Sequence, residues 1–365
     1  MNRRQVLIGG GTLAALGATA AFSDVRKMGS SSEYGDATRT LRSPLSAQPE
    51  SREFIRYATL APNSHNTQAW RFALSPNHIA IRPDFSRRTP TVDPDDHHLF
   101  VTLGCAAENL ALVAAARGHP GELSFNDTNG GAIEFAYTNA SPAPSVLFDA
   151  IPTRQSTRAE YDGRTVSVAD LKTLSTAAAI SGVDMMLITN RPQMNHIRDL
   201  VVRGNTAQLG DEAFVRELKS WLRFSPRRAI AMGDGLYSAT TGNPALPEWL
   251  GPLFFDMLVT AKSENEKYAG QLNSSAGVAV FFGAREDREH WALTGRACQR
   301  FALQATALGL KHAFINQPVE VPALRSELAS LLGMSGRRPD IVMRFGYGPP
   351  LPYSMRRAVE TVVDG

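Results

Sequence analysis

The residues best suited to binding chemistry lie in a short segment, 61–72, which reads Ala-Pro-Asn-Ser-His-Asn-Thr-Gln-Ala-Trp-Arg-Phe. Its amide and hydroxyl side chains, those of Asn63, Ser64, Asn66 and Gln68, can donate and accept hydrogen bonds in one plane. Such a set suits the alternating donors and acceptors along the edge of a heterocyclic ring. The alternative is an Asn- and Ser-rich turn whose side chains satisfy only the local backbone.

A predicted helix and a predicted strand flank this segment. Apolar residues recur at helical spacing over 51–60, and they alternate with polar neighbours around 79–81. We expect the helix to stop at Pro62, because proline cannot continue it. Trp70 then fixes the loop to the core.

The order of residues in the loop resembles the S-P-S-x-x-N-x-Q-P-W motif of the nitroreductase family of FMN proteins. The sequence departs from that motif with Asn63 in place of Ser and Ala69 in place of Pro. The resemblance implies that FMN is the cofactor and that the loop binds it through Pro62, Asn63, Ser64, Asn66 and Gln68.

A second segment, Arg154-Gln155-Ser156-Thr157-Arg158, resembles the R-x-S-x-[KR] element of the same family. Arg154 and Ser156 suit a phosphate dianion, which needs a forked cation and a hydroxyl donor. The resemblance implies that Gln155 also binds the cofactor. It places Arg158 near N1 and O2 of the flavin, as a catalytic residue whose fixed positive charge stabilises the anionic reduced ring.

Two C-terminal stretches complete the predicted site by the same resemblance. The closing basic pair implies a phosphate contact for Arg357, with Arg356 as a second candidate, although Met355 stands where the family has Lys. The stretch 314–317 corresponds to a loop that offers a backbone N–H to flavin N5. Asn316 and Gln317 are therefore expected at the cofactor, Asn316 as a catalytic residue.

An internal repeat connects the two parts of the chain. Residues 104–118 align without gaps on 295–309, with glycines at both ends and coinciding Ala and Leu residues inside. A predicted strand follows each copy, at 123–125 and 313–315, as expected if the final glycine ends each helix. Coincidence between two Ala-rich helices is the alternative, because Ala is the best helix former.

The resemblance implies an α+β fold in which two nitroreductase-like halves form a single-chain pseudo-dimer around a mostly antiparallel sheet with flanking helices. We expect the halves at 46–150 and 151–365, with an insertion at about 205–265 that covers the flavin. One FMN per chain is expected, since the two cofactor motifs each occur once. A chain that carries its own dimer interface is expected to be a monomer. These features are typical of the Acg-like branch of the family.

The N-terminus resembles a twin-arginine export signal over 1–24. Two adjacent arginines precede a Gly- and Ala-rich apolar run that ends at Phe22, and 18–20 reads Ala-Thr-Ala, a possible cleavage site. We expect recognition by the twin-arginine translocation machinery, a periplasmic location, and a flexible linker over 25–45. Membrane anchoring is the alternative if the signal is not cleaved.

Composition and the remaining motifs exclude other classes. A net charge of +3 in 365 residues, without basic runs interleaved with aromatics, argues against a nucleic-acid partner. Asp95-Asp96-His97-His98 could ligate a metal, but Asp93-Pro94 ahead of them is typical of a helix start, so no metal is expected. Cys105 and Cys298 lie in apolar stretches and are expected as buried free thiols, with a disulfide as the alternative in an exported protein.

The sequence thus predicts an FMN-dependent oxidoreductase. It would pass two electrons from a small-molecule reduced donor through FMN to a nitroaromatic or quinone-like acceptor. The alternative is an exported protein that stores or sequesters FMN without turnover.

Overall fold

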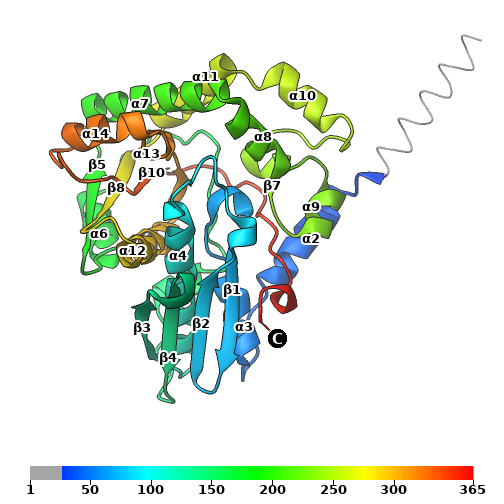
Figure 1. The fold of residues 1–365 in the computed structure, drawn as a ribbon, viewed down its shortest axis with the longest axis vertical. Helices are drawn as coiled ribbons and strands as arrows, with labels where there is room; N and C mark the ends of the chain where they lie inside the picture. The colour runs from blue at the N-terminus through cyan, green and yellow to red at the C-terminus, as the bar shows by residue number, and fades with distance from the viewer. Residues whose placement is uncertain (1–26, 365) are drawn as a thin grey trace, which may run out of the picture.

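The structure is a computed structural model that describes residues 27–364 (Figure 1). The expected export signal over 1–24 lies outside the described residues. Three sheets and their flanking helices make an α+β architecture, as the sequence predicts. The expected central sheet is in fact two separate four-stranded sheets.

Both four-stranded sheets are antiparallel throughout. The first has the order β1-β2-β4-β3 and consists of β1 (Trp70–Ser75), β2 (His78–Pro83), β3 (Gly121–Asn126) and β4 (Ala132–Tyr137). The second has the order β5-β8-β10-β9 and consists of β5 (Val183–Ile188), β8 (Gly277–Gly283), β9 (Lys311–Phe314) and β10 (Ile341–Gly346). A small parallel pair is formed by β6 (Leu222–Arg223) and β7 (Leu236–Tyr237).

The two large sheets share one topology. In each, a long helix follows the second strand and leads to an edge strand, which then pairs with the last strand of the sheet. These helices are α4 (His97–Ala116) and α12 (Arg288–Ala307), and they lie beside each other in the centre of the molecule (Figure 1). The repeated helix-turn-strand unit predicted from the sequence is confirmed.

Glycine permits the close crossing of α4 and α12. A Cβ atom on Gly104 would lie 1.9 Å from the carbonyl oxygen of Ala292, and one on Gly295 would lie 2.0 Å from that of Val101. The same offset of 191 residues relates Gly104 to Gly295 and Val101 to Ala292. The two contacts are therefore reciprocal, as in an interface with two-fold symmetry.

Helix α4 is the core of the molecule. Within the described residues it is the one helix long and apolar enough to cross a membrane, but 83% of that apolar stretch is buried inside the protein.

The C-terminal segment returns to the first sheet, where the N–H of Phe72 donates to Val362 O at 2.8 Å. A segment near the end of the described residues thus packs against the first sheet.

A long helical insertion separates β5 from β8. It contains α7 (Arg191–Gly210), α8 (Glu212–Ser220), α9 (Pro226–Met232), α10 (Gly251–Leu258) and α11 (Ala261–Asn273). Two shorter helices, α13 (Gln317–Glu320) and α14 (Pro322–Leu331), lie between β9 and β10. The other helices of the two halves are α3 (Ser51–Ala58), α5 (Val146–Ala150) and α6 (Val168–Ala177).

A helix replaces most of the expected flexible linker over 25–45. Helix α2 (Ser31–Leu41) begins with a capping box, in which the Ser30 hydroxyl accepts from the N–H of Glu33 and the Glu33 carboxylate accepts from the N–H of Ser30. Tyr34 is buried, and its ring lies 4.4 Å from that of Tyr237. Burial of this face explains why the segment is ordered against the insertion.

Candidate functional site

The loop 62–68 lies between α3 and β1, as predicted, and its backbone is unusual. Helix α3 ends at Ala58, before Pro62. Three residues that are not glycine adopt left-handed conformations, His65 with φ 45°, Asn66 with φ 54° and Gln68 with φ 55°. Such conformations cost free energy and concentrate at functional sites.

Two adjoining cavities lie beside this loop. The larger has a volume of about 410 Å³ and the smaller about 50 Å³. Five residues line both, namely Pro62, Asn63, Arg158, Leu236 and Phe314. A ligand with a small charged end and a larger body would therefore have continuous space.

Arginine side chains surround the smaller cavity. Arg154 and Arg356 are buried, and their Nη2 atoms donate to the same acceptor, the carbonyl oxygen of Leu60, at 2.9 and 3.2 Å. Arg42 and the Ser156 side chain complete this wall. The Nε and Nη1 atoms of Arg154 are buried without a hydrogen-bond partner in the described structure.

These guanidinium groups lack a neutralising carboxylate. Burial lowers the pKa of Arg154 to about 10. Burial together with repulsion from the neighbouring arginines lowers the pKa of Arg42 to about 10 and that of Arg356 well below its usual range. Among the described residues, no Asp or Glu forms an ion pair with them. Since an unpaired buried charge is costly, the cluster is suited to a bound dianion such as a phosphate monoester.

The larger cavity has a polar inner wall and an apolar outer wall. The inner wall is formed by Asn63, Ser64, Arg158, Asn316 and Gln317. The outer wall comes from the insertion and includes the apolar side chains of Phe214, Leu218, Leu222, Phe224, Leu246 and Phe255. The part of the chain expected to cover the site, about 205–265, does line this cavity.

A partly buried acid, Glu320, and two histidines, His65 and His98, also line the larger cavity. Burial raises the pKa of Glu320, whose Oε2 accepts from Gln208 Nε2 at 2.6 Å. His98 Nδ1 lies 3.8 Å from Glu320 Oε1. Burial, with Arg158 and His98 nearby, lowers the pKa of His65 to about 4. No motif in the sequence indicated that Glu320 lines this cavity.

The structure brings most of the predicted site residues together. The larger cavity, the smaller one or both are lined by Pro62, Asn63, Ser64, Asn66, Arg154, Gln155, Ser156, Arg158, Asn316, Gln317 and Arg356. They come from four separate segments of the chain, 62–66, 154–158, 316–317 and the C-terminal segment that holds Arg356. The structure brings these segments to one place.

Two predicted cofactor-binding residues, Gln68 and Arg357, bond to other parts of the protein. Gln68 Nε2 donates to Gly233 O at 2.8 Å, and its Oε1 accepts from the N–H of Arg357 at 2.8 Å, so its amide joins three segments of protein. The Arg357 guanidinium donates to Thr361 O and lies 3.8 Å from Asp84. Neither residue is among those that line the two cavities described above, so their contact with the cofactor stays a prediction.

Asn66 has a mainly structural role as well. Its Nδ2 donates to Gly235 O at 3.0 Å and Met355 O at 3.1 Å, and its Oδ1 accepts from Arg356 Nη1 at 3.0 Å. The Asn66 amide therefore links the loop 62–68 by hydrogen bonds to the insertion and to the C-terminal segment. This position also orients Arg356 at the smaller cavity.

Arg42 is a site residue that the sequence did not reveal. It follows α2, in the segment expected to be a linker, and lines the smaller cavity. Its guanidinium lies 4.2 Å from the centroid of the Tyr353 ring. The capping box at Ser30 and Glu33 was the available signal that this segment is helical.

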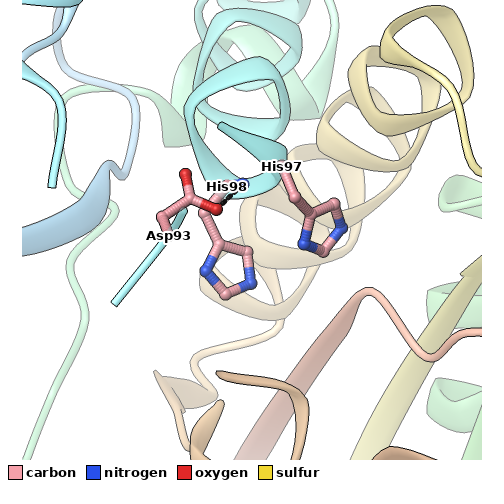
Figure 2. Close-up of side chains that lie close together, drawn as sticks. All are labelled: Asp93, His97 and His98. Carbon is pink, nitrogen blue, oxygen red and sulfur yellow. Dashed lines mark hydrogen bonds between the residues drawn. The ribbon is translucent and has the colours of Figure 1, made fainter. Parts of the chain in front are cut away.

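The side chains of Asp93, His97 and His98 lie close enough to suggest a metal site (Figure 2). Both oxygens of Asp93 accept from helix N–H groups, those of His98 at 3.0 Å and Leu99 at 2.9 Å. His97 Nε2 lies 2.8 Å from Asp340 Oδ1. The predicted helix start at Asp93-Pro94 is therefore wrong, because α4 begins at His97 with Asp96 at its N-cap position. Asp93 still accepts from two N–H groups of the first turn.

Comparison with known proteins gives relatives of low sequence identity. The chain is 25% identical over 324 residues to "Putative NAD(P)H nitroreductase Rv3131" of Mycobacterium tuberculosis, covering 86% of this chain and 90% of that protein. It is 23% identical over 322 residues to "Putative NAD(P)H nitroreductase acg" of the same species, covering 84% and 93%. These relatives support the expected resemblance to nitroreductases. No model of a known protein family matches the chain.

Solved structures with partial similarity include two bacterial flavoproteins. One is the FMN-dependent nitroreductase NfnB from Mycobacterium smegmatis in complex with NADPH, with 12% identity, a TM-score of 0.37, and coverage of 60% of this chain and 91% of that one. Another is a nitroreductase with bound FMN from Desulfitobacterium hafniense, with 14% identity, a TM-score of 0.39, and coverage of 59% and 96%.

Proposed function

We propose that the protein is an FMN-dependent oxidoreductase that passes two electrons from a reduced donor to a nitroaromatic or quinone-like acceptor. The observation that carries the proposal is the small cationic cavity opening into a larger one with a polar inner wall. This arrangement matches a phosphate attached to a planar heterocycle. The names of the mycobacterial relatives support the same class of reaction.

The residues present fit FMN. Arg154 has two buried nitrogen atoms without a partner, and together with Arg42, Arg356 and Ser156 it would hold the phosphate. Arg158 lines both cavities and would place a positive charge beside the ring. When bound, FMN supplies reversible two-electron transfer.

The side chains that line the larger cavity would surround the flavin ring and the acceptor. Asn316 and Gln317 lie on its polar wall, where the proposal places them near the reacting edge of the ring. Glu320, whose pKa is raised by burial, lines the same cavity. The insertion supplies apolar side chains to the outer side of the cavity.

An absorbance experiment tests this proposal. The purified protein is supplied with FMN, freed of unbound flavin, and followed anaerobically as NADPH and then dithionite are added. Bleaching of bound flavin by NADPH and its recovery with a nitroaromatic would support the oxidoreductase. Failure to retain any FMN would overturn it.

Storage of FMN is the second candidate, because the insertion covers the site with apolar side chains and would hinder a nicotinamide donor. Flavin that bleaches with dithionite but with none of several donors would favour it. The same titration therefore separates the two functions.

We further propose that the chain is a fused dimer, active as a monomer and exported by the twin-arginine route. The repeated sheet topology and the reciprocal glycine contacts support fusion. The arginine pair at Arg3 and Arg4 supports export. Fractionation of cells that express the Arg3→Lys/Arg4→Lys variant tests export, and sedimentation velocity tests the oligomeric state.

A further inference from the structure

Helix α10 presents apolar side chains both to the larger cavity and to solvent. Leu253, Met257 and the preceding Trp249 are 55%, 74% and 59% exposed. Phe254 and Leu258 are 38% and 59% exposed, and both also line the cavity. These five residues, the α10 strip, therefore connect the cavity to the surface.

Polar contacts attach α10 to the protein and leave the strip uncovered. Before the helix, Glu248 Oε1 accepts from the N–H groups of Phe224 at 3.0 Å and Ser225 at 2.7 Å. Within the helix, Asp256 forms an ion pair with Lys219. Exposed apolar patches of this kind are typical of binding surfaces.

The outer wall of the cavity suits an uncharged ligand. Phenylalanine and leucine side chains form much of this wall, and of the described residues on it Lys267 is the one Lys or Arg side chain. The Lys267 ammonium group lies 4.0 Å from the carboxylate of Glu264, which offsets its charge. A polyanion would find little to bind there, whereas an alkyl or isoprenoid chain would find apolar contacts.

Resting on the proposed function, we propose that the acceptor is an amphiphile, a quinone head group with an apolar tail. The head lies in the cavity against the polar inner wall. The tail passes Phe254 and Leu258 and lies along the α10 strip. In the reaction the head takes up two electrons, supplied by the reduced donor, and two protons, and becomes the quinol.

Calorimetric titration of the flavin-loaded protein tests whether an apolar tail contributes to binding. The two ligands are benzoquinones with the same ring, one with a decyl group and one with a methyl group in its place. Burial of three or four methylene groups should make the decyl compound bind roughly a hundredfold tighter. In the Leu253→Gln/Met257→Gln variant this ratio should fall below about tenfold, since the tail loses its apolar contacts.

The matched control is Val146→Gln/Val168→Gln, which changes two exposed valines on α5 and α6. It should keep the full ratio. Equal affinities for the two quinones, or an affinity ratio that is unchanged in the Leu253→Gln/Met257→Gln variant, would overturn the proposal that the acceptor is an amphiphile. If the flavin still bleaches with a donor in that case, the proposed function stands; if the protein retains no flavin, the proposed function fails instead.

A membrane surface is the other occupant that the strip could accept. Sedimentation with phosphatidylcholine vesicles distinguishes it from a tail-binding path. Vesicle binding that requires Leu253 and Met257, without any preference for the decyl quinone, would assign the strip to membrane docking and overturn the proposal.

Discussion

Three guanidinium groups at the smaller cavity, those of Arg42, Arg154 and Arg356, hold positive charge without a carboxylate partner in the described chain. Their mutual repulsion opposes folding when no anion is bound. A bound dianion reverses this effect, because charge-assisted hydrogen bonds then form in a buried setting. The cluster therefore couples the stability of the protein to its ligand.

Replacement of Arg154 by methionine separates the contribution of this guanidinium to FMN binding from its effect on the stability of the flavin-free protein. We expect Arg154→Met to bind FMN more weakly by about 2 to 3 kcal/mol, the value of hydrogen bonds to a charged group. The flavin-free variant should melt at a higher temperature than flavin-free wild type, since a buried repulsive charge is removed. Fluorescence titration and thermal unfolding measure the two quantities.

Arg300→Met is the matched control for this prediction. Arg300 is partly buried and forms an ion pair with Glu108 at 2.7 Å. Its loss should lower the melting temperature and leave FMN affinity unchanged, because Arg300 lies outside both cavities. Relative to flavin-free wild type, the melting temperature should therefore rise in Arg154→Met and fall in Arg300→Met. Unchanged FMN affinity in Arg154→Met would contradict the assignment of Arg154 to the phosphate.

A second prediction at the scale of residues concerns the two cysteines. Cys105 Sγ and Cys298 Sγ lie 3.6 Å apart between α4 and α12, longer than a disulfide bond, so both are free thiols in this structure. Burial raises the pKa of Cys105. We expect a bulky maleimide to label neither thiol in the native protein and both in guanidinium chloride, as read by mass spectrometry. Absence of labelling after unfolding would instead indicate a disulfide.

At the scale of elements, the crossing of α4 and α12 depends on glycine. We expect Gly295→Ala to lower the free energy of unfolding by about 3 kcal/mol, because its Cβ would meet Val101 O at 2.0 Å and force the helices apart. Gly210→Ala, at the end of α7, is the matched control, since nothing lies within 4 Å of its Cβ. That variant should be neutral or slightly stabilised. Urea unfolding measures both, and equal stabilities would show that the helices can separate without cost.

Elements with strong local signals were predictable from the sequence. The repeated helices and their following strands were found because glycine, alanine and apolar spacing act within a few residues. Helix α2 was missed because its polar composition resembles a linker, and its stability comes from burial of Tyr34 against Tyr237, more than 200 residues away. The amide role of Gln68 was missed for the same reason, since its partner Gly233 lies far along the chain.

At the scale of the whole molecule, the fold buries histidines that must remain neutral. Burial lowers the pKa of His97 to about 4 and that of His312 well below its usual range. In the unfolded chain these groups take up protons below about pH 6.5. Between pH 6.5 and the lower folded value, the unfolded state binds more protons, so stability falls as pH decreases. Glu320 acts in the opposite direction, because its raised pKa favours the folded state at lower pH.

His312 isolates the histidine contribution, because it is fully buried in β9 and neither ring nitrogen has a hydrogen-bond partner in the described structure. His312→Leu removes the proton-binding group without leaving a polar partner unsatisfied. We expect its stability relative to wild type to rise by about 2 kcal/mol between pH 7.5 and pH 5, from the slope of 1.4 kcal/mol per pH unit below pH 6.5. Urea unfolding at the two pH values measures this change, with His196→Leu, exposed on α7, as the control expected to shift both stabilities equally. A parallel response of His312→Leu and wild type would mean that His312 takes up its proton in the folded protein as readily as in the unfolded chain, and that acid sensitivity arises at other groups.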